Sequence, residues 1–396
     1  MDTVYFSISG WLVAVWWSLG AMALAMVWLL TFYRGRLAKI IKTGKNQAVE
    51  ASDPSEGAPK EAVDVSVIVY AEDNAQGLMR MLPSVLAQEY AGRMEVIVIN
   101  DGSCSDVADV VKMLQGAHKN LYLTFVPDEA HNLSRKKLAI SLGVKAAKYP
   151  YVVITSANCE IPSARWLTLM AAPFAAGKQV SLGVSRLANL RGAMNRFDEA
   201  EATAVWLSSA LAGHPYRGDG HNIGYATELF FRVKGFSKSL TLHNGDDDIF
   251  ISRIATPENT GVVVNPDAIV TIDSAMSERL LRESRINHCF TGRFITRTPS
   301  ALFGASTLML WALIAASVAG VVWSLPNALP ACIILAAWIG LWLPLAMAWK
   351  GVCRTLGIRV SAWALPWLMT WRWVRSMRYR MVCGRPSRKN YTWLQH

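Results

Sequence analysis

Two long runs without a charged side chain constrain this chain more than any other feature. The first extends over Tyr5–Tyr33, and the second lies between Arg297 and Lys350. A helix rises about 1.5 Å per residue, so the first run can cross a hydrocarbon core of about 30 Å. Prolines near the middle of the second run predict two helices joined by a tight turn, over roughly Ser300–Leu325 and Ala331–Trp349. The sequence therefore predicts three membrane spans.

A cleaved signal peptide is the alternative interpretation of the first run. Such a peptide begins with basic residues and has a shorter apolar stretch that ends in small residues. This chain begins Met1-Asp2, and its positive cluster, Arg34–Lys45, follows the apolar run. These features favour a retained N-terminal transmembrane helix over residues 1–33. Residues 34–63 are then a basic juxtamembrane segment and a linker.

Positive charge is concentrated beside the apolar runs. The net charge is +11, yet residues 46–297 hold 25 Lys and Arg against 28 Asp and Glu, and residues 350–396 hold ten basic residues and no acid. The positive-inside rule places both basic clusters in the cytoplasm. Nucleic-acid binding would need a basic stripe on the folded domain, and the sequence shows none. We therefore expect a multi-pass protein of the bacterial inner membrane, with a cytoplasmic domain and no nucleic-acid partner.

Two further segments have the composition of helices that lie on a membrane surface. Residues 277–297 contain basic and apolar side chains at helical spacing, and Ser361–Cys383 is rich in Trp and Arg. They predict one interfacial helix before a transmembrane hairpin at 298–349, and another within a basic cytoplasmic tail at 350–396. A further span at Ser361–Cys383 is the alternative, and the arginines near its centre argue against it.

Strands and helices alternate in the segment that follows the linker. Short β-branched runs predict strands at Val65–Tyr70, Glu95–Ile99, Leu121–Val126 and Tyr151–Thr155. Apolar residues at helical spacing predict helices between them, at Leu78–Ala87, Val107–Leu114 and Leu133–Ala147. This alternation indicates an α/β fold with a doubly wound, mostly parallel sheet and helices on both faces.

Polar clusters directly follow three of these strands. Glu72 and Asp73 follow the first strand, Asp101 follows the second, and Ser156 and Asn158 follow the fourth. A single polar turn of this kind is common in any loop. Ligands of such sheets, however, bind beyond the carboxyl ends of the strands, so three clusters at one edge indicate a binding site.

With these motifs the chain resembles the glycosyltransferase family 2 superfamily, which has the GT-A fold. The segments that carry the resemblance occur in the family's order: VSVIVYAEDN, EVIVINDGSCSD, ITSANCEIPSARWL, HPYRGDGHNIGYATELFFRVKGF and HNGDDDIFISR. The resemblance covers about Asp64–Ile295 and implies a transferase domain over residues 64–276. It implies an inverting enzyme, of the hexosyltransferase type, that moves a sugar from a nucleotide-sugar donor to a lipid-linked or envelope-glycan acceptor.

The resemblance also implies roles for individual residues. Asp247 would be the general base that takes a proton from the acceptor hydroxyl, and Asp101 would bind the nucleotide base. The other residues expected on the donor side are Glu72, Asp73, Lys137, Ser156 and Asn158. Those expected on the acceptor side, or in support of the base, are Asn222, Asp246, Asp248 and Arg285.

Several of these residues also have a purely structural interpretation. The acidic triplet Asp246–Asp248 could be the acid-rich start of a helix. The basic triplet Arg135–Lys137 begins a predicted helix with Ser134 as its N-cap, where it could contact phosphate or form a solvated face. The glycines around Asn222 could mark a tight turn rather than an acceptor pocket.

Ser156 and Asn158 depart from the family, because they replace both acids of its Asp-x-Asp motif. Those acids hold a divalent cation against the donor diphosphate, and neutral oxygens are weaker ligands for Mg²⁺ or Mn²⁺. We expect weakened metal binding, with Asn158 as the remaining ligand, or cations in place of the metal. A transferase-like subunit without activity, which binds a nucleotide or a protein partner in glycan assembly, is the alternative function.

Overall fold

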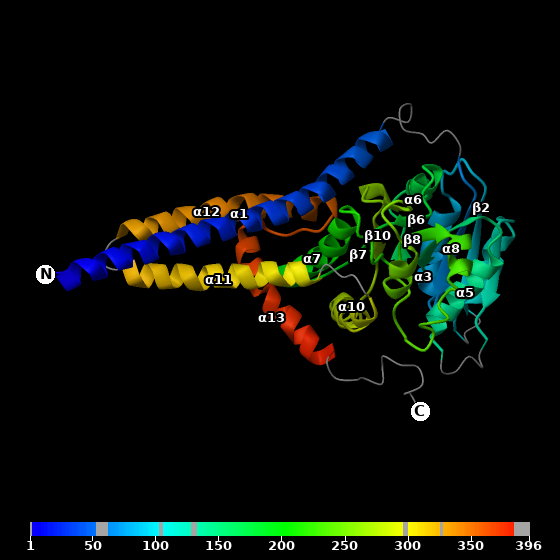
Figure 1. Cartoon of the computed structure of the whole chain (residues 1–396). Coiled ribbons are helices and arrows are strands. Elements are labelled where there is room, and N and C mark those ends of the chain that lie inside the picture. The colour runs from blue at the N-terminus through cyan, green and yellow to red at the C-terminus, as the bar shows by residue number, and fades with distance from the viewer. Residues whose placement is uncertain are drawn as a thin grey trace.

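The computed structural model describes residues 2–52, 62–102, 106–127, 133–295, 300–324 and 328–383. An α/β domain lies at one end, and a bundle of long helices extends away from it (Figure 1). The bundle consists of α1 (Asp2–Ser52), α11 (Ser300–Ser324) and α12 (Ala328–Thr355). The N-terminus lies at the far tip of the bundle, whereas α13 (Leu365–Cys383) runs back beside the domain (Figure 1).

A seven-stranded sheet with the order β3-β2-β1-β4-β8-β6-β9 forms the centre of the domain. Four strands are parallel: β1 (Val65–Ala71), β2 (Met94–Asn100), β3 (Leu121–Phe125) and β4 (Tyr151–Ser156). The next strand, β8 (Ile223–Ala226), is antiparallel to its neighbours β4 and β6, and the last two are β6 (Val180–Leu182) and β9 (Thr260–Val262). The predicted α/β fold with a mostly parallel sheet is confirmed.

Alternate side chains of β1 enter two different cores. Val65, Val67 and Val69 pack with helices α3 (Ala75–Leu86), α4 (Asp106–Gln115) and α6 (Trp166–Ala175). Ile68 belongs to the other core, which includes α5 (Arg135–Ala146) and α7 (Ala193–Ala210). Successive residues of a strand point to opposite faces, so a run that is apolar throughout is buried on both sides.

A second, three-stranded sheet and three further helices complete the domain. The sheet has the order β5 (Cys159–Glu160), β10 (Val270–Ile272) and β7 (Ser185–Leu187). The helices are α8 (Thr227–Arg232), α9 (Ile249–Ile254) and α10 (Ser277–Thr291). Helix α10 packs against both α7 and α13, which brings the C-terminal region of the chain to the domain.

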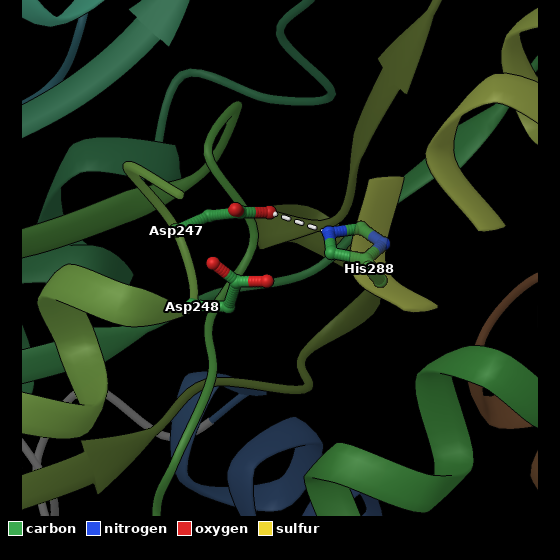
Figure 2. A group of neighbouring side chains, drawn as sticks. All are labelled: Asp247, Asp248 and His288. Carbon is green, nitrogen blue, oxygen red and sulfur yellow. Dashed lines mark hydrogen bonds and ion pairs between the residues drawn. The ribbon is translucent and has the colours of Figure 1, made fainter. Parts of the chain in front are cut away.

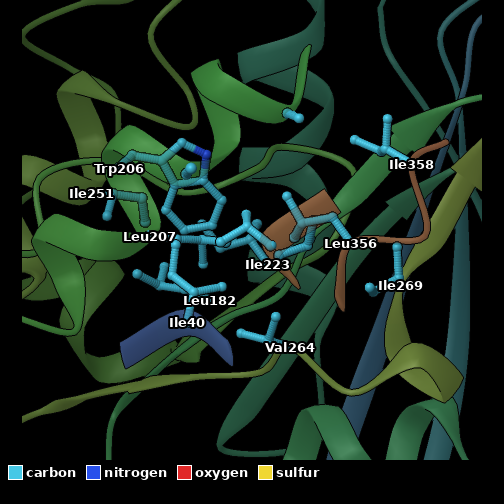
Figure 3. Close-up of a cluster of buried hydrophobic side chains, with 14 of the residues drawn as sticks. Ile40, Leu182, Trp206, Leu207, Ile223, Ile251, Val264, Ile269, Leu356 and Ile358 are labelled. Atoms are coloured by element: carbon cyan, nitrogen blue, oxygen red, sulfur yellow. The ribbon is translucent and has the colours of Figure 1, made fainter. Parts of the chain in front are cut away.

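The core on the α7 side of the sheet continues into the foot of the bundle. Ile40 of α1 lies with Leu182 and Ile223 of the sheet, and Leu356, just after α12, joins the same cluster (Figure 3). The side chain of Gln47 donates to the carbonyl oxygen of Val262 and accepts from the N–H of Val264. Residues 34–63 were expected to be a juxtamembrane segment and a linker, but α1 continues through Ser52, and these bonds hold its end at the edge of the sheet.

The predicted pair of apolar helices is present. Gly304–Val322 and Cys332–Thr355 are each long and apolar enough to cross a membrane. Large apolar side chains on these helices point outward, among them Leu308, Leu335 and Leu343 at 73%, 62% and 60% exposure. The turn expected between the two helices, and the last residues of the basic tail, lie outside the described residues.

Candidate active site and a cavity beside it

Each member of the acidic triplet has its own partner. Asp246 forms an ion pair with Lys136, with Oδ2 and Nζ 2.7 Å apart. Oδ2 of Asp247 lies 3.0 Å from Nε2 of His288, as Figure 2 shows. Asp248 caps α9 by accepting from the N–H of Ile249, and its other oxygen accepts from the hydroxyl of Thr291. The helix-start interpretation therefore holds for Asp248, whereas the other two acids are held by α5 and α10.

The environment separates the pKa values of Asp247 and Asp248. Burial acts to raise the pKa of Asp247, but the charges of His288, Arg217 and Lys136, together with the His288 hydrogen bond, hold it well below its usual range. Burial, and after it the charge of Asp247, raise the pKa of Asp248. The environment thus shifts the pKa values of two adjacent carboxyls in opposite directions, and it favours the ionised form of Asp247.

His288 is a site residue that the sequence analysis missed. It lies on α10, and its Nδ1 is 3.2 Å from the hydroxyl oxygen of Ser284 one turn earlier. Ser284 on one side and Asp247 on the other therefore orient the imidazole ring. The only signal in the sequence was its position in the basic and apolar run of residues 277–297.

At the end of the second strand, Asp101 is held from two sides. One carboxylate oxygen accepts from the hydroxyl of Tyr70 at 2.6 Å, and the other accepts from Nε of Arg135 at 2.7 Å. Glu72 and Asp73 are exposed nearby, and the carboxylate of Asp73 fills the space that a Cβ on Gly102 would need. The structure thus brings Asp101 and Asp73 together, as predicted for the donor edge.

Lys137, which was predicted to contact the donor, lies in the interior of the domain. It is fully buried, and its Nζ donates to the carbonyl oxygens of Ser239, Leu242 and Asn244 at 2.7, 3.0 and 2.7 Å. Burial lowers its pKa to about 8. These bonds stabilise the loop that leads into the acidic triplet. Lys137 therefore holds this loop in place and does not contact the donor itself. Arg135 and Lys136 are paired but retain side-chain exposures of 35% and 28%.

Ser156 and Asn158 do not form a site that fits Mg²⁺ or Mn²⁺. The buried hydroxyl of Ser156 lies 3.7 Å from the sulfur of Cys159, and this thiol donates to Oδ1 of Asn158 at 3.6 Å. Hard cations require charged oxygens, and these positions supply two neutral oxygens and a thiol. Within the described residues, the ligand atoms of Asp247, Asp248 and His288 lie within 4.8 Å of one another, close enough to hold a metal ion (Figure 2).

Asn222 also differs from its predicted role at the acceptor. It is fully buried, its Nδ2 donates to the carbonyl oxygens of Val184 and Ala268, and its Oδ1 accepts from the indole of Trp166. These bonds satisfy the side-chain amide within the core and connect the sheets. Asn222 therefore stabilises the fold and is not available to a substrate.

Arg285 lies at a cavity next to the acidic triplet. Its guanidinium is 3.3 Å from both Asp198 and Glu201 of α7. The cavity, which we call the junction cavity, lies where α10, α11 and α13 meet and has a volume of about 820 Å³. Asp248 and His288 line one part of it, and residues of α11 line another. Its volume is in the usual range for a small-molecule site, about 300–1,000 Å³.

Comparisons with known proteins agree with this fold. Residues 64–227 match the model of glycosyl transferase family 2, a segment that ends before the acidic triplet. The sequence matches no curated protein.

Three solved structures are similar to the chain. Mannosyltransferase PcManGT from Pyrobaculum calidifontis, in complex with GDP-Man and Mn²⁺, is 18% identical with a TM-score of 0.49, covering 92% of this chain and 97% of that chain. S. aureus TarS 1–349 is 14% identical with a TM-score of 0.40, covering 81% and 90%. Glucosyl-3-phosphoglycerate synthase from Mycobacterium tuberculosis, with Mn²⁺ and UDP-Glc, is 14% identical with a TM-score of 0.42, covering 60% and 81%.

Proposed function

Because residues 64–227 match the model of glycosyl transferase family 2, we propose that this protein moves a hexosyl group from a nucleotide-sugar donor to a lipid-linked or envelope-glycan acceptor. We place the reaction at the cytoplasmic face of a bacterial inner membrane. The observation that carries the proposal is the carboxylate of Asp247, whose Oδ2 lies 3.0 Å from Nε2 of His288, beside a cavity that reaches an apolar helix. A partly buried carboxylate beside a cavity can take a proton from an acceptor hydroxyl that comes within hydrogen-bond reach.

In the proposed reaction, the acceptor hydroxyl oxygen attacks the anomeric carbon of the donor sugar. The bond from that carbon to the donor phosphate breaks, and its electron pair leaves with the nucleoside diphosphate. Asp247 takes the proton of the hydroxyl, so the attacking oxygen becomes the new glycosidic oxygen. One displacement of this kind inverts the anomeric configuration.

The leaving diphosphate needs positive charge, and the start of α5 offers it. Arg135 and Lys136 keep partly exposed side chains there, and the free N–H groups of a helix start favour phosphate as well. Asp101 would accept a hydrogen bond from the nucleotide base, with Tyr70 and Arg135 holding its carboxylate in place. Since Ser156 and Asn158 do not fit a metal, no step in this account depends on one.

The distribution of side chains supports the membrane location. If the protein were soluble, the outward-facing leucines of α11 and α12 would be exposed to water. Soluble proteins rarely expose apolar surfaces of that size. Basic residues lie beside both apolar regions, as the positive-inside rule requires for the cytoplasmic side. The proposed topology has the N-terminus outside and the α/β domain inside.

A second function is favoured by one observation, the pair Ser156 and Asn158 beside the thiol of Cys159. Loss of both metal-binding acids would suit a transferase-like subunit that binds a nucleotide or a protein partner in glycan assembly. Titration calorimetry of the full chain with UDP and GDP, with and without Mn²⁺, followed by donor turnover, separates the two. Nucleotide binding with turnover supports the enzyme, whereas binding without turnover supports the subunit.

The Asp247→Asn variant tests the proposed base directly. We expect kcat to fall by about 10²–10⁴-fold, the usual contribution of a positioned base, while nucleotide affinity is kept. Asp109→Asn is the matched control, because Asp109 is an exposed acid on α4 whose ion pair among the described residues is with Lys112. Transfer at the wild-type rate by Asp247→Asn would remove this residue from the mechanism.

A further inference from the structure

The junction cavity has two chemically different parts. Asp248, His288 and Arg217 line one part, next to the proposed base. Leu308 and Trp311 of α11 line another, and both belong to the segment Gly304–Val322 that is apolar enough to cross a membrane. Figure 1 shows α10, α11 and α13 converging beside the domain. A ligand in this cavity would therefore touch His288, the partner of the proposed base, and an apolar helix at once.

Positive charge dominates the cavity wall. Five arginines line it, against the two carboxylates of Glu201 and Asp248. Arg285 and Arg372 are paired with Glu201, so their charge is largely compensated within the protein. Arg293 donates to the carbonyl oxygen of Cys383. The remaining two arginines decide what the cavity can bind.

Arg217 and Arg380 form no ion pair with any residue that the structure describes. Nε of Arg217 is buried and has no hydrogen-bond partner among the described residues, although a buried guanidinium nitrogen without a partner is costly. Arg380 is exposed on α13, at the same cavity. The charge of Arg217 also acts on the carboxylates of Asp247 and Asp248. Two guanidinium groups without an ion-pair partner at one cavity can bind an anion, and a phosphate matches their paired donors best.

The apolar wall identifies the rest of the ligand. Leu308 of α11 is 73% exposed and Met377 of α13 is 50% exposed, and both line the cavity. A small polar anion would leave this surface uncovered. A hydrocarbon chain, which enters from the bilayer beside α11, would cover it.

We propose that the junction cavity binds the acceptor, and that the acceptor is a lipid carrying a phosphate or diphosphate. The phosphate binds Arg217 and Arg380, the hydrocarbon chain lies against Leu308 and Met377, and the group beyond the phosphate reaches the Asp247–His288 pair. This inference rests on the proposed transferase function, for which it names the acceptor class. Asp247 and His288 then separate the acceptor, which enters from the membrane side, from the donor at the strand ends.

Native mass spectrometry of the full chain in detergent tests the proposal, with dioleoyl phosphatidic acid as the probe. Dioleoylglycerol and inorganic phosphate are the comparison ligands, since each carries only one of the two features. We expect the protein to retain phosphatidic acid and to retain neither comparison ligand. Equal retention of dioleoylglycerol, or retention of inorganic phosphate as strong as that of the lipid, would overturn the proposal.

Arginine variants locate the binding. Charge-assisted hydrogen bonds support changes of about ten- to a hundredfold in affinity, so Arg217→Gln should weaken retention of phosphatidic acid by at least about tenfold. Arg380→Gln should weaken it as well, and because this side chain is exposed the variant keeps the fold. Arg378→Gln is the matched control, exposed on the same helix but outside the cavity lining. Unchanged retention in both cavity variants, or an equal loss in the control, contradicts the site.

Calorimetry with UDP and GDP on the same preparation distinguishes this proposal from the function on which it rests. Nucleotide binding without retention of phosphatidic acid leaves the transferase and removes the lipid phosphate site. Retention that depends on Arg217 and Arg380, without nucleotide binding, keeps the lipid site and removes the transferase.

Discussion

Helix α13 is attached to the domain by buried charges, and Glu201 at their centre allows a quantitative test. The side chain of Glu201 is 3% exposed, and its two oxygens lie 3.3 Å from nitrogens of Arg285 and Arg372. Glu201→Gln keeps the shape of the side chain and removes its charge. Two buried guanidinium groups then lose a counter-charge.

Removal of one partner from a buried ion pair costs about 3–5 kcal/mol, because the remaining charge stays uncompensated. The amide oxygen of glutamine still accepts a hydrogen bond, so we expect the lower end, about 3 kcal/mol. At about 2–4 °C per kcal/mol for domains of 150–250 residues, the unfolding midpoint should fall by roughly 6 °C. Thermal unfolding of the detergent-solubilised full chain, followed by tryptophan fluorescence, measures this change.

Two further variants make the test specific. Glu201→Gln combined with Arg372→Met removes both members of one pair, and such replacements are often nearly neutral, so the double variant should be more stable than the single one. Glu283→Gln is the control, because Glu283 pairs with Arg279 at the surface, where ion pairs contribute about 0–1 kcal/mol. An unchanged midpoint for Glu201→Gln, or a double variant less stable than the single one, would refute the reasoning.

Two further predictions concern proton binding and metal. Burial raises the pKa of Glu199 on α7 to about 7, so protonation favours the folded state. This stabilisation is complete below the unfolded pKa of about 4.3 and is lost as the pH rises through about 7. Glu199→Gln should therefore raise the unfolding midpoint at pH 8 and change it little at pH 4, and an equal shift at both pH values would show that the carboxyl does not titrate in this range. Replacing Ser156 and Asn158 together by Asp should strengthen Mn²⁺ binding in calorimetry, whereas unchanged heats would show that these positions do not face a metal site.

The strands, the helices between them and the edge that carries the polar clusters could all be predicted from the sequence. Each depends on a local pattern: strands buried on both faces are apolar throughout, and the residues that follow parallel strands meet at one edge. The place of Asp101 follows from the same logic, whereas that of Asp247 was implied only by the resemblance to glycosyltransferase family 2. In the structure Tyr70 and Arg135 hold the side chain of Asp101, and His288 holds that of Asp247. The catalytic or binding role of each residue remains a prediction.

Burial of polar side chains could not be predicted in this way. Lys137 was expected at the donor and Asn222 at the acceptor, because polar residues near a site are usually assigned to its ligand. In the structure, carbonyl groups from Ser239 to Asn244 surround the ammonium of Lys137, and those of Val184 and Ala268 bind Asn222. These partners come from segments that are distant in the sequence. The residues around Lys137 or Asn222 therefore do not predict them.

The C-terminal helix shows why counted charges and paired charges differ. Ser361–Cys383 is predicted to be an interfacial helix, and in the structure its Arg372 and Arg375 each lie 3.3 Å from an acid of α7, more than 170 positions earlier in the chain. A count of charges along the sequence cannot distinguish these two arginines from Arg380. In the structure Arg380 has no acidic partner among the described residues. Packing against α7 compensates the first two arginines and thereby fixes α13 beside the domain. The same packing places Arg380 at the junction cavity with its charge uncompensated, so the ion pairs that stabilise α13 also determine which cation is available to a ligand.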